Sequence, residues 1–133
     1  MATTTAKLTL SSSDLTSDSI SLIPSNTLYD AATSTGMSKT TGLARYSTGG
    51  TSETKILESG DYTSDKAHKI YIKNTSTTRT EYIDVTIGTV DGSTKIGRLY
   101  AGEWAFMPWS GTADLNVTQS AASIVIEWML IYE

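Results

Sequence analysis

The chain has a single histidine, His68, which lies between Lys66 and Lys69 at the start of a predicted strand. A Ser-His-Asp hydrolase needs an exposed, oriented histidine and a nucleophilic serine on a strained strand-to-helix turn. The Gly-x-Ser-x-Gly motif that builds such a turn does not occur in the sequence. A lone histidine at a strand edge is more often structural or simply solvated. We therefore expect His68 to have no catalytic role.

Several carboxylates lie close together along the chain. Asp61 with Asp65, or Glu81 with Asp84, would offer the two carboxylates that a glycosidase needs on either side of a cleft. Nothing in the sequence places either pair in a cleft, and residues 14–18 match no calcium-binding loop. The absence of cysteine excludes thiolate zinc sites and cysteine catalysis. We predict that the protein is not an enzyme and uses no cofactor or metal.

The densest group of large side chains lies in residues 97–109. Its aromatic members are Tyr100, Trp104, Phe106 and Trp109. With Arg98 or Glu103 as polar partners, these rings would form a sugar-stacking platform. In a strand, however, Trp104 and Phe106 share one face, which favours a place in the core or a subunit interface. Trp109 follows Pro108 at a loop, so we expect it to be the most exposed of the set and an anchor for a protein contact.

The same stretch predicts two short strands that meet at a corner. Gly102 supplies the positive φ that such a corner requires. The carboxylate of Glu103 is placed to accept hydrogen bonds from nearby backbone N–H groups. We expect this corner to set the direction of the second strand.

The elements that position these residues follow from composition. Hydroxyl side chains dominate, with 23 Thr and 18 Ser among 133 residues, whereas helix-forming residues are scarce. The net charge is −4, and acidic and basic residues are interspersed along the chain. There is no basic stripe to neutralise nucleic-acid phosphates. No apolar run has the length of a membrane span, and the first residues lack the apolar region of a signal peptide. We predict an all-β protein with no nucleic-acid partner, no membrane association and no signal peptide.

Apolar and polar residues alternate most clearly in residues 68–73 and 81–87. Eight or nine such strands, with turn signals between them, favour a single antiparallel β-sandwich or jelly-roll-like domain. Residues 51–133 would form its main core. Residues 1–50 are a Ser/Thr-rich segment with short strands, which would suit either an arm lying across a neighbouring subunit or a floppy N-terminal third.

The last predicted strand, residues 123–133, has two unequal faces. One face is wholly apolar and should lie in the core; its residues are Ile124, Ile126, Trp128, Leu130 and Tyr132. The other face places Val125, Met129 and Ile131 among glutamates. A face exposed to water should not carry three such residues, so either loops or a partner must cover it. We favour a partner.

The second half of the chain, residues 54–133, resembles small virion structural proteins of tailed bacteriophages. The order of its segments carries the resemblance: a strand, an Asn-Thr loop, a second strand, a Leu-x-x-Gly-Glu corner, a proline and a closing strand. These segments are residues 69–76, 83–88, 99–103, 108 and 131–133. The resemblance implies a non-enzymatic β-sandwich subunit that decorates or cements a capsid, or belongs to a tail. It carries over no catalytic residues.

Together these points predict a capsid decoration or cement protein that stabilises a phage head by binding between capsid subunits. Its partners would be the major capsid protein and further copies of itself, with a trimer favoured. It would be located in the virion, which is assembled in the host cytoplasm. The candidate interface residues are Pro108, Trp109, Val125, Met129 and Ile131. The alternative is a tail or receptor-binding component with a carbohydrate-binding aromatic surface.

Overall fold

The computed structural model describes residues 2–133, and its strands are antiparallel throughout these residues. The prediction of an all-β sandwich is confirmed: residues 2–133 form antiparallel sheets, and their only helical element is the short η1 (Ser59–Asp61). The chain divides into two compact units at residues 38 and 39. The sequence prediction began the main sandwich at residue 51, whereas the second compact unit begins at Lys39.

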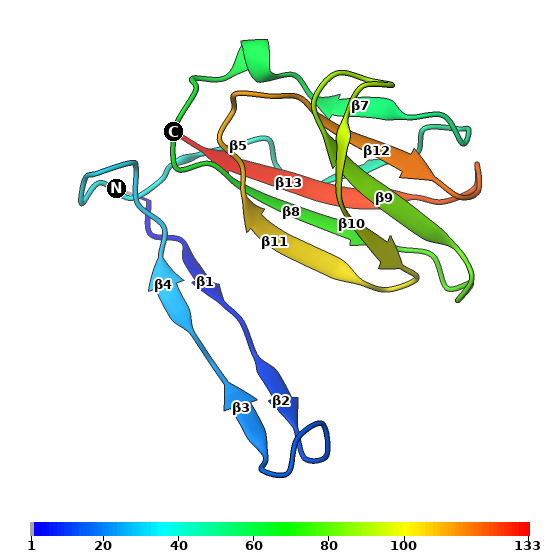
Figure 1. Cartoon of the computed structure of the whole chain (residues 1–133). Helices are drawn as coiled ribbons and strands as arrows, with labels where there is room; N and C mark the ends of the chain where they lie inside the picture. Colours follow the sequence, from blue (N-terminus) through cyan, green and yellow to red (C-terminus); the bar gives the residue numbers. More distant parts are fainter. Residues whose placement is uncertain (1) are drawn as a thin grey trace. The chain divides into compact units, whose positions relative to one another are not determined.

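The first unit is a long two-stranded ribbon (Figure 1). β1 (Thr5–Lys7) pairs with β4 (Ser25–Thr27), and β2 (Leu10–Ser12) pairs with β3 (Ile20–Leu22). Between the two ladders the backbone N–H of Leu8 still donates to the carbonyl of Pro24 at 3.0 Å. Pro24 has no N–H to return that bond, which explains why the ladder is interrupted there.

The second unit contains two sheets (Figure 1). One sheet has the order β10 (Thr94–Tyr100), β9 (Tyr82–Ile87), β12 (Leu115–Gln119) and β7 (Thr54–Leu57). The other has the order β11 (Trp104–Pro108), β8 (Lys69–Asn74), β13 (Ile126–Tyr132) and β5 (Lys39–Thr40), with β6 (Ala44–Tyr46) also paired with β13. Residues 39–46 therefore belong to this sheet, because β5 and β6 pair with the closing strand.

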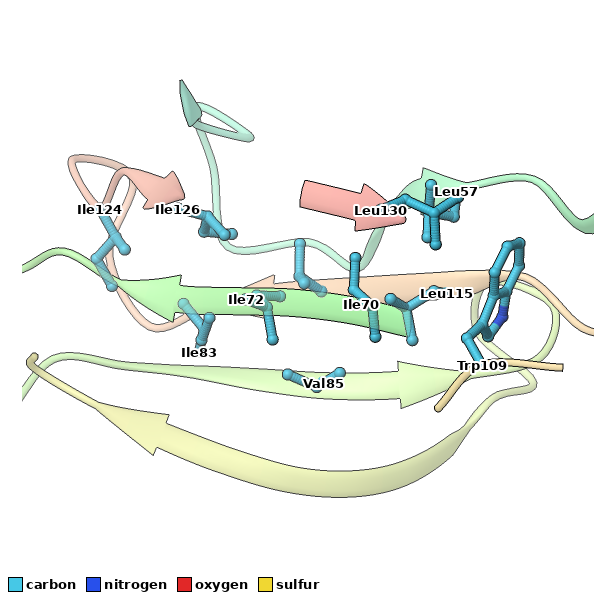
Figure 2. Close-up of a cluster of buried hydrophobic side chains, with 11 residues drawn as sticks. Leu57, Ile70, Ile72, Ile83, Val85, Trp109, Leu115, Ile124, Ile126 and Leu130 are labelled. Atoms are coloured by element: carbon cyan, nitrogen blue, oxygen red, sulfur yellow. The ribbon is translucent and has the colours of Figure 1, made fainter. Parts of the chain in front are cut away.

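The core of the second unit lies between its two sheets (Figure 2). Each sheet contributes the residues of one face, in the alternation that strands impose. The buried cluster consists of Leu57, Ile70, Ile72, Ile83, Val85, Trp109, Leu115, Val117, Ile124, Ile126 and Leu130. Full burial of one such aliphatic side chain stabilises a fold by roughly 1.5–3 kcal/mol. The predicted inward faces of β8, β9 and the closing strand are thus confirmed.

The corner at Gly102 forms as predicted. Gly102 has φ of +81°, and the Glu103 N–H donates to the Tyr100 carbonyl at 2.9 Å. The Glu103 carboxylate accepts the Tyr100 N–H at 2.7 Å. This short turn links the end of β10 to the start of β11, which lie in different sheets.

Among the predictions for residues 97–109, the exposure of Trp109 is wrong, and of the two places expected for Trp104 and Phe106, core or subunit interface, the core is excluded. Trp109 is only 3% exposed, whereas Trp104 is 49% exposed and Phe106 is 39% exposed. The reason is the register of β11 on β8, in which Met107 lies opposite the buried Ile70. Met107 and its alternate neighbours therefore face inward, and Trp104 and Phe106 face outward. Trp109 continues the inward series and is not a surface anchor.

Candidate interaction surface

The outer face of the β11–β8–β13 sheet carries Trp104, the most exposed aromatic residue of the second unit, beside other aromatic residues. In its central row, Phe106 lies opposite Tyr71, and Tyr71 lies opposite Met129. Trp104 precedes Phe106 by two residues on β11, so it is on the same face. We call these four residues, Tyr71, Trp104, Phe106 and Met129, the aromatic platform. They come from three hydrogen-bonded strands, which fixes their spacing.

Charged residues border the platform. In the row beside the central one, Trp104 lies opposite Lys73 and Lys73 lies opposite Glu127. The Tyr71 hydroxyl donates to a Glu127 carboxylate oxygen at 3.1 Å, and the Arg45 guanidinium lies 3.4 Å from the other. Burial, with the bond to Glu127 as a second cause, raises the pKa of the Tyr71 hydroxyl. Tyr71 thus remains an uncharged donor at neutral pH.

A third row lies on the opposite side of the central row. There Pro108 lies opposite Lys69, and Lys69 lies opposite Ile131. Ile131 is 9% exposed, so little of it is offered to a partner. Burial lowers the pKa of Lys69, whose ammonium donates to the Ala67 carbonyl at 2.6 Å. The platform is bordered by Lys69, Lys73 and Arg45 against Glu127 and Glu133, of which Glu133 acts on the Lys69 ammonium and pairs with Lys66. Cations thus outnumber carboxylates there, although the chain as a whole is acidic.

The platform extends to the edge of its sheet. β11 is the terminal strand of that sheet, and Pro108 ends it (Figure 1). A proline at this position removes a backbone donor from the open edge, which discourages the addition of another strand. The surface is therefore suited to contact through side chains.

The five predicted interface residues are distributed between the surface and the interior. Pro108, Met129 and Ile131 lie on the outer face that carries the platform. Val125 precedes β13 and is half-buried; its carbonyl accepts the Thr75 hydroxyl at 2.7 Å. Trp109 lies at one end of the core, where its indole N–H donates to the Ala113 carbonyl at 2.9 Å (Figure 2).

Trp104 and Phe106 were expected in the core or in a subunit interface, and they were not among the five candidate interface residues. Their signal was present in the alternation of β11. Alternation leaves open which face of β11 points into the core. The larger side chains, Trp104 and Phe106, favour their own face as the buried one over the face of Ala105 and Met107. The pairing with β8 puts the smaller face inside.

His68 is fully buried among aromatic rings. One of its ring nitrogens, Nε2, lies 2.9 Å from the Thr63 carbonyl oxygen. The rings of Tyr62, Trp109 and Tyr132 have centroids within 6.3 Å of the His68 ring. Of the two roles expected for this histidine, structural or solvated, its burial supports the structural one.

Of the carboxylates considered for catalysis, Glu81 and Asp84 are engaged in hydrogen bonds or ion pairs, whereas Asp61 and Asp65 are exposed. Asp84 binds Arg98 through two bonds of 2.7 and 3.0 Å and contacts the Lys95 ammonium at 2.7 Å. The bond from Arg98 is the main cause that lowers the pKa of Asp84. Glu81 accepts a hydrogen bond from Ser76. Asp84 is thus held as an anion by two cations, which does not suit a general acid.

Within residues 2–133 no group of three or more His, Asp or Glu side chains is arranged to hold a metal ion. The same part of the chain has no helix that is long and apolar enough to span a membrane. Comparison with protein-family models, with curated proteins and with solved structures found no match.

Proposed function

We propose that this chain is a non-enzymatic structural protein of a virion, which decorates a capsid by binding between capsid subunits. The exposure of Trp104 and Phe106 on a paired strand is the observation that carries the proposal. The resemblance of residues 54–133 to small phage virion proteins gives the partner its identity, the major capsid protein.

The energetics of the aromatic platform favour a protein partner. Tryptophan, tyrosine and methionine are enriched where proteins meet, and a few such residues account for most of the binding energy. Covering the exposed half of a large ring stabilises a complex by about 1 kcal/mol, taking half the value for full burial. Because many copies bind one shell, modest contacts of this size suffice to reinforce it.

The bordering charges favour an acidic partner. Three cations, Lys69, Lys73 and Arg45, outnumber the carboxylates of Glu127 and Glu133 around the platform. Complementary charge speeds association and selects partners, and its effect falls as salt rises. We therefore expect faster binding at low ionic strength, with the aromatic contact retained at high ionic strength.

Co-sedimentation with purified, undecorated capsids tests the proposal. The wild-type chain should pellet with the capsids, and the Trp104→Ala/Phe106→Ala variant should stay in the supernatant. Ile96→Ala is the matched control, because Ile96 is 50% exposed on β10 of the other sheet. Pelleting with purified tails, and not with capsids, would move the protein to the tail. Failure to bind either particle would reject a virion role.

A carbohydrate-binding role is the second candidate, because Trp104, Phe106 and Tyr71 together offer the exposed aromatic surface that such a role requires. Tryptophan emission titrated with host glycans distinguishes the two functions. Trp109 is buried and Trp128 packs partly buried against the core, so a shift would come mainly from Trp104. A shift that disappears in Trp104→Phe supports sugar binding; unchanged emission supports the protein partner.

A further inference from the structure

The ribbon of the first unit has a continuous register. Thr5 lies opposite Thr27 in one ladder and Leu10 lies opposite Leu22 in the other, so no residue is inserted between the ladders. Residues that lie opposite one another in antiparallel strands share a face, and alternate residues along a strand do so too. The side chains of the whole ribbon therefore sort into two faces.

The two faces differ sharply in chemistry. One, which we call the apolar ribbon face, consists of Ala6, Leu8, Leu10, Ile20, Leu22 and Pro24, with Ser12 and Asn26 at its two ends. The opposite face consists mainly of hydroxyl residues, with Lys7 and Ile23 among them. The alternation of leucine with serine and threonine thus produces an amphipathic ribbon.

The apolar ribbon face is open to solvent. Leu8 is 41% exposed, Leu10 50% and Leu22 52%. An isolated two-stranded ribbon is marginally stable at best in water, and needs a further layer over its apolar side. Contiguous exposed apolar residues of this kind mark an interaction site.

We propose that the apolar ribbon face packs against the same face of a second copy of this chain. The face carries no charge, because Lys7 lies on the opposite face and Asp14 and Asp18 lie in the tip between β2 and β3. An identical face therefore buries no unpaired charge on contact. Every copy has the same uncovered element, which a symmetric contact satisfies on both sides at once.

This contact gives the two units separate roles. The ribbon joins copies to one another, and its hydroxyl face stays in water. Two stacked ribbons would form two layers about 10 Å apart, the usual spacing of packed sheets. The residues of the aromatic platform all belong to the second unit and are not part of this contact.

The molar mass in solution, measured by light scattering after size exclusion, tests this contact on the full chain. The wild type should have the mass of a dimer at micromolar concentration, and Leu10→Thr/Leu22→Thr should have that of a monomer. Ser11→Thr/Ser21→Thr changes the opposite face of the same strands and should leave the mass unchanged. A monomeric wild type, or an unchanged mass in the leucine variant, would overturn the proposal.

Crosslinking separates loss of contact from loss of ribbon structure. The chain has no cysteine, so one introduced thiol reports one position. Leu10→Cys and Ser11→Cys are neighbours on β2, both exposed within one chain and on opposite faces. A short bis-maleimide should join two chains of Leu10→Cys and not of Ser11→Cys; equal yields would contradict the assigned face. All three tryptophans lie in the second unit, so unchanged emission confirms that the sandwich is intact.

Discussion

Arg98 and Asp84 form a two-pronged ion pair on the outer face of the β10–β9 sheet, with Nε–Oδ1 at 2.7 Å and Nη2–Oδ2 at 3.0 Å. The two residues lie opposite each other in the ladder. The same guanidinium lies over the Tyr82 ring, 3.6 Å from its centroid. A planar guanidinium satisfies the carboxylate and covers the ring at once, which an ammonium does not.

Replacing Arg98 should destabilise the second unit. Arg98→Met keeps an apolar stem over Tyr82 and leaves the nearly buried Asp84 with Lys95 as its remaining cation. We expect a lower urea midpoint with an unchanged slope, since a desolvated carboxylate loses its best partner. The urea midpoint of Arg98→Lys should fall between those of Arg98→Met and the wild type. Arg79→Met, at an exposed loop residue, serves as the control. Equal midpoints for Arg98→Met and wild type would contradict the role given to the pair.

Asp114 should make the stability of the second unit depend on pH in the acid range. Its carboxylate accepts the Lys55 ammonium at 2.8 Å and the Ser59 N–H at 2.8 Å, which lower its pKa to about 2. A depressed pKa stabilises the fold above the ordinary carboxyl range, near pH 4, and this contribution is lost as pH falls towards 2. Asp114→Asn should therefore weaken the fold at neutral pH and flatten its acid dependence. The thermal unfolding midpoints of wild type and Asp114→Asn, measured between pH 2 and 7, test this prediction. If the two midpoints fall in parallel as the pH is lowered, the prediction is contradicted.

Trp109 and Trp104 should differ strongly in their effect on stability. Trp109→Ala empties a buried site at the end of the core and should cost about 3–5 kcal/mol of unfolding free energy. Trp104→Ala removes a half-exposed ring from the platform and should change stability by only about 0.5 kcal/mol. Urea denaturation of both variants makes the comparison. The reverse order would mean that the register of β11 on β8 is wrong.

Gly102→Ala should test the corner by backbone strain alone. A Cβ at Gly102 would meet no atom within 4 Å, so the positive φ of +81° is the only obstacle. We expect a loss of roughly 1–2 kcal/mol, the penalty for a side chain in the left-handed region. Gly60→Ala is the matched control, because its Cβ also meets open space and its φ is not positive. Equal losses in the two variants would show that φ is not the cause.

Local patterns were enough to predict several features of this fold. The scarcity of helix formers and the abundance of threonine indicate β structure, and alternation in residues 68–73 and 81–87 identifies the inward faces of β8 and β9. The corner is also local, because Gly102 and Glu103 act within a few residues of each other. Alternation in the N-terminal segment does not distinguish an arm from a floppy N-terminal third, because its strands contain too few apolar residues for a core.

The aromatic platform could not be predicted from local patterns alone. Alternation in β11 determines that Trp104 and Phe106 share one face and that Ala105, Met107 and Trp109 share the other. Which of these faces points inward depends on the strand beside it, because Met107 must lie opposite the buried Ile70. The sequence by itself therefore determined the all-β class, the faces of individual strands and the corner. Only the tertiary structure decided which face of β11 is exposed, because strand pairing is a contact between residues far apart in the chain.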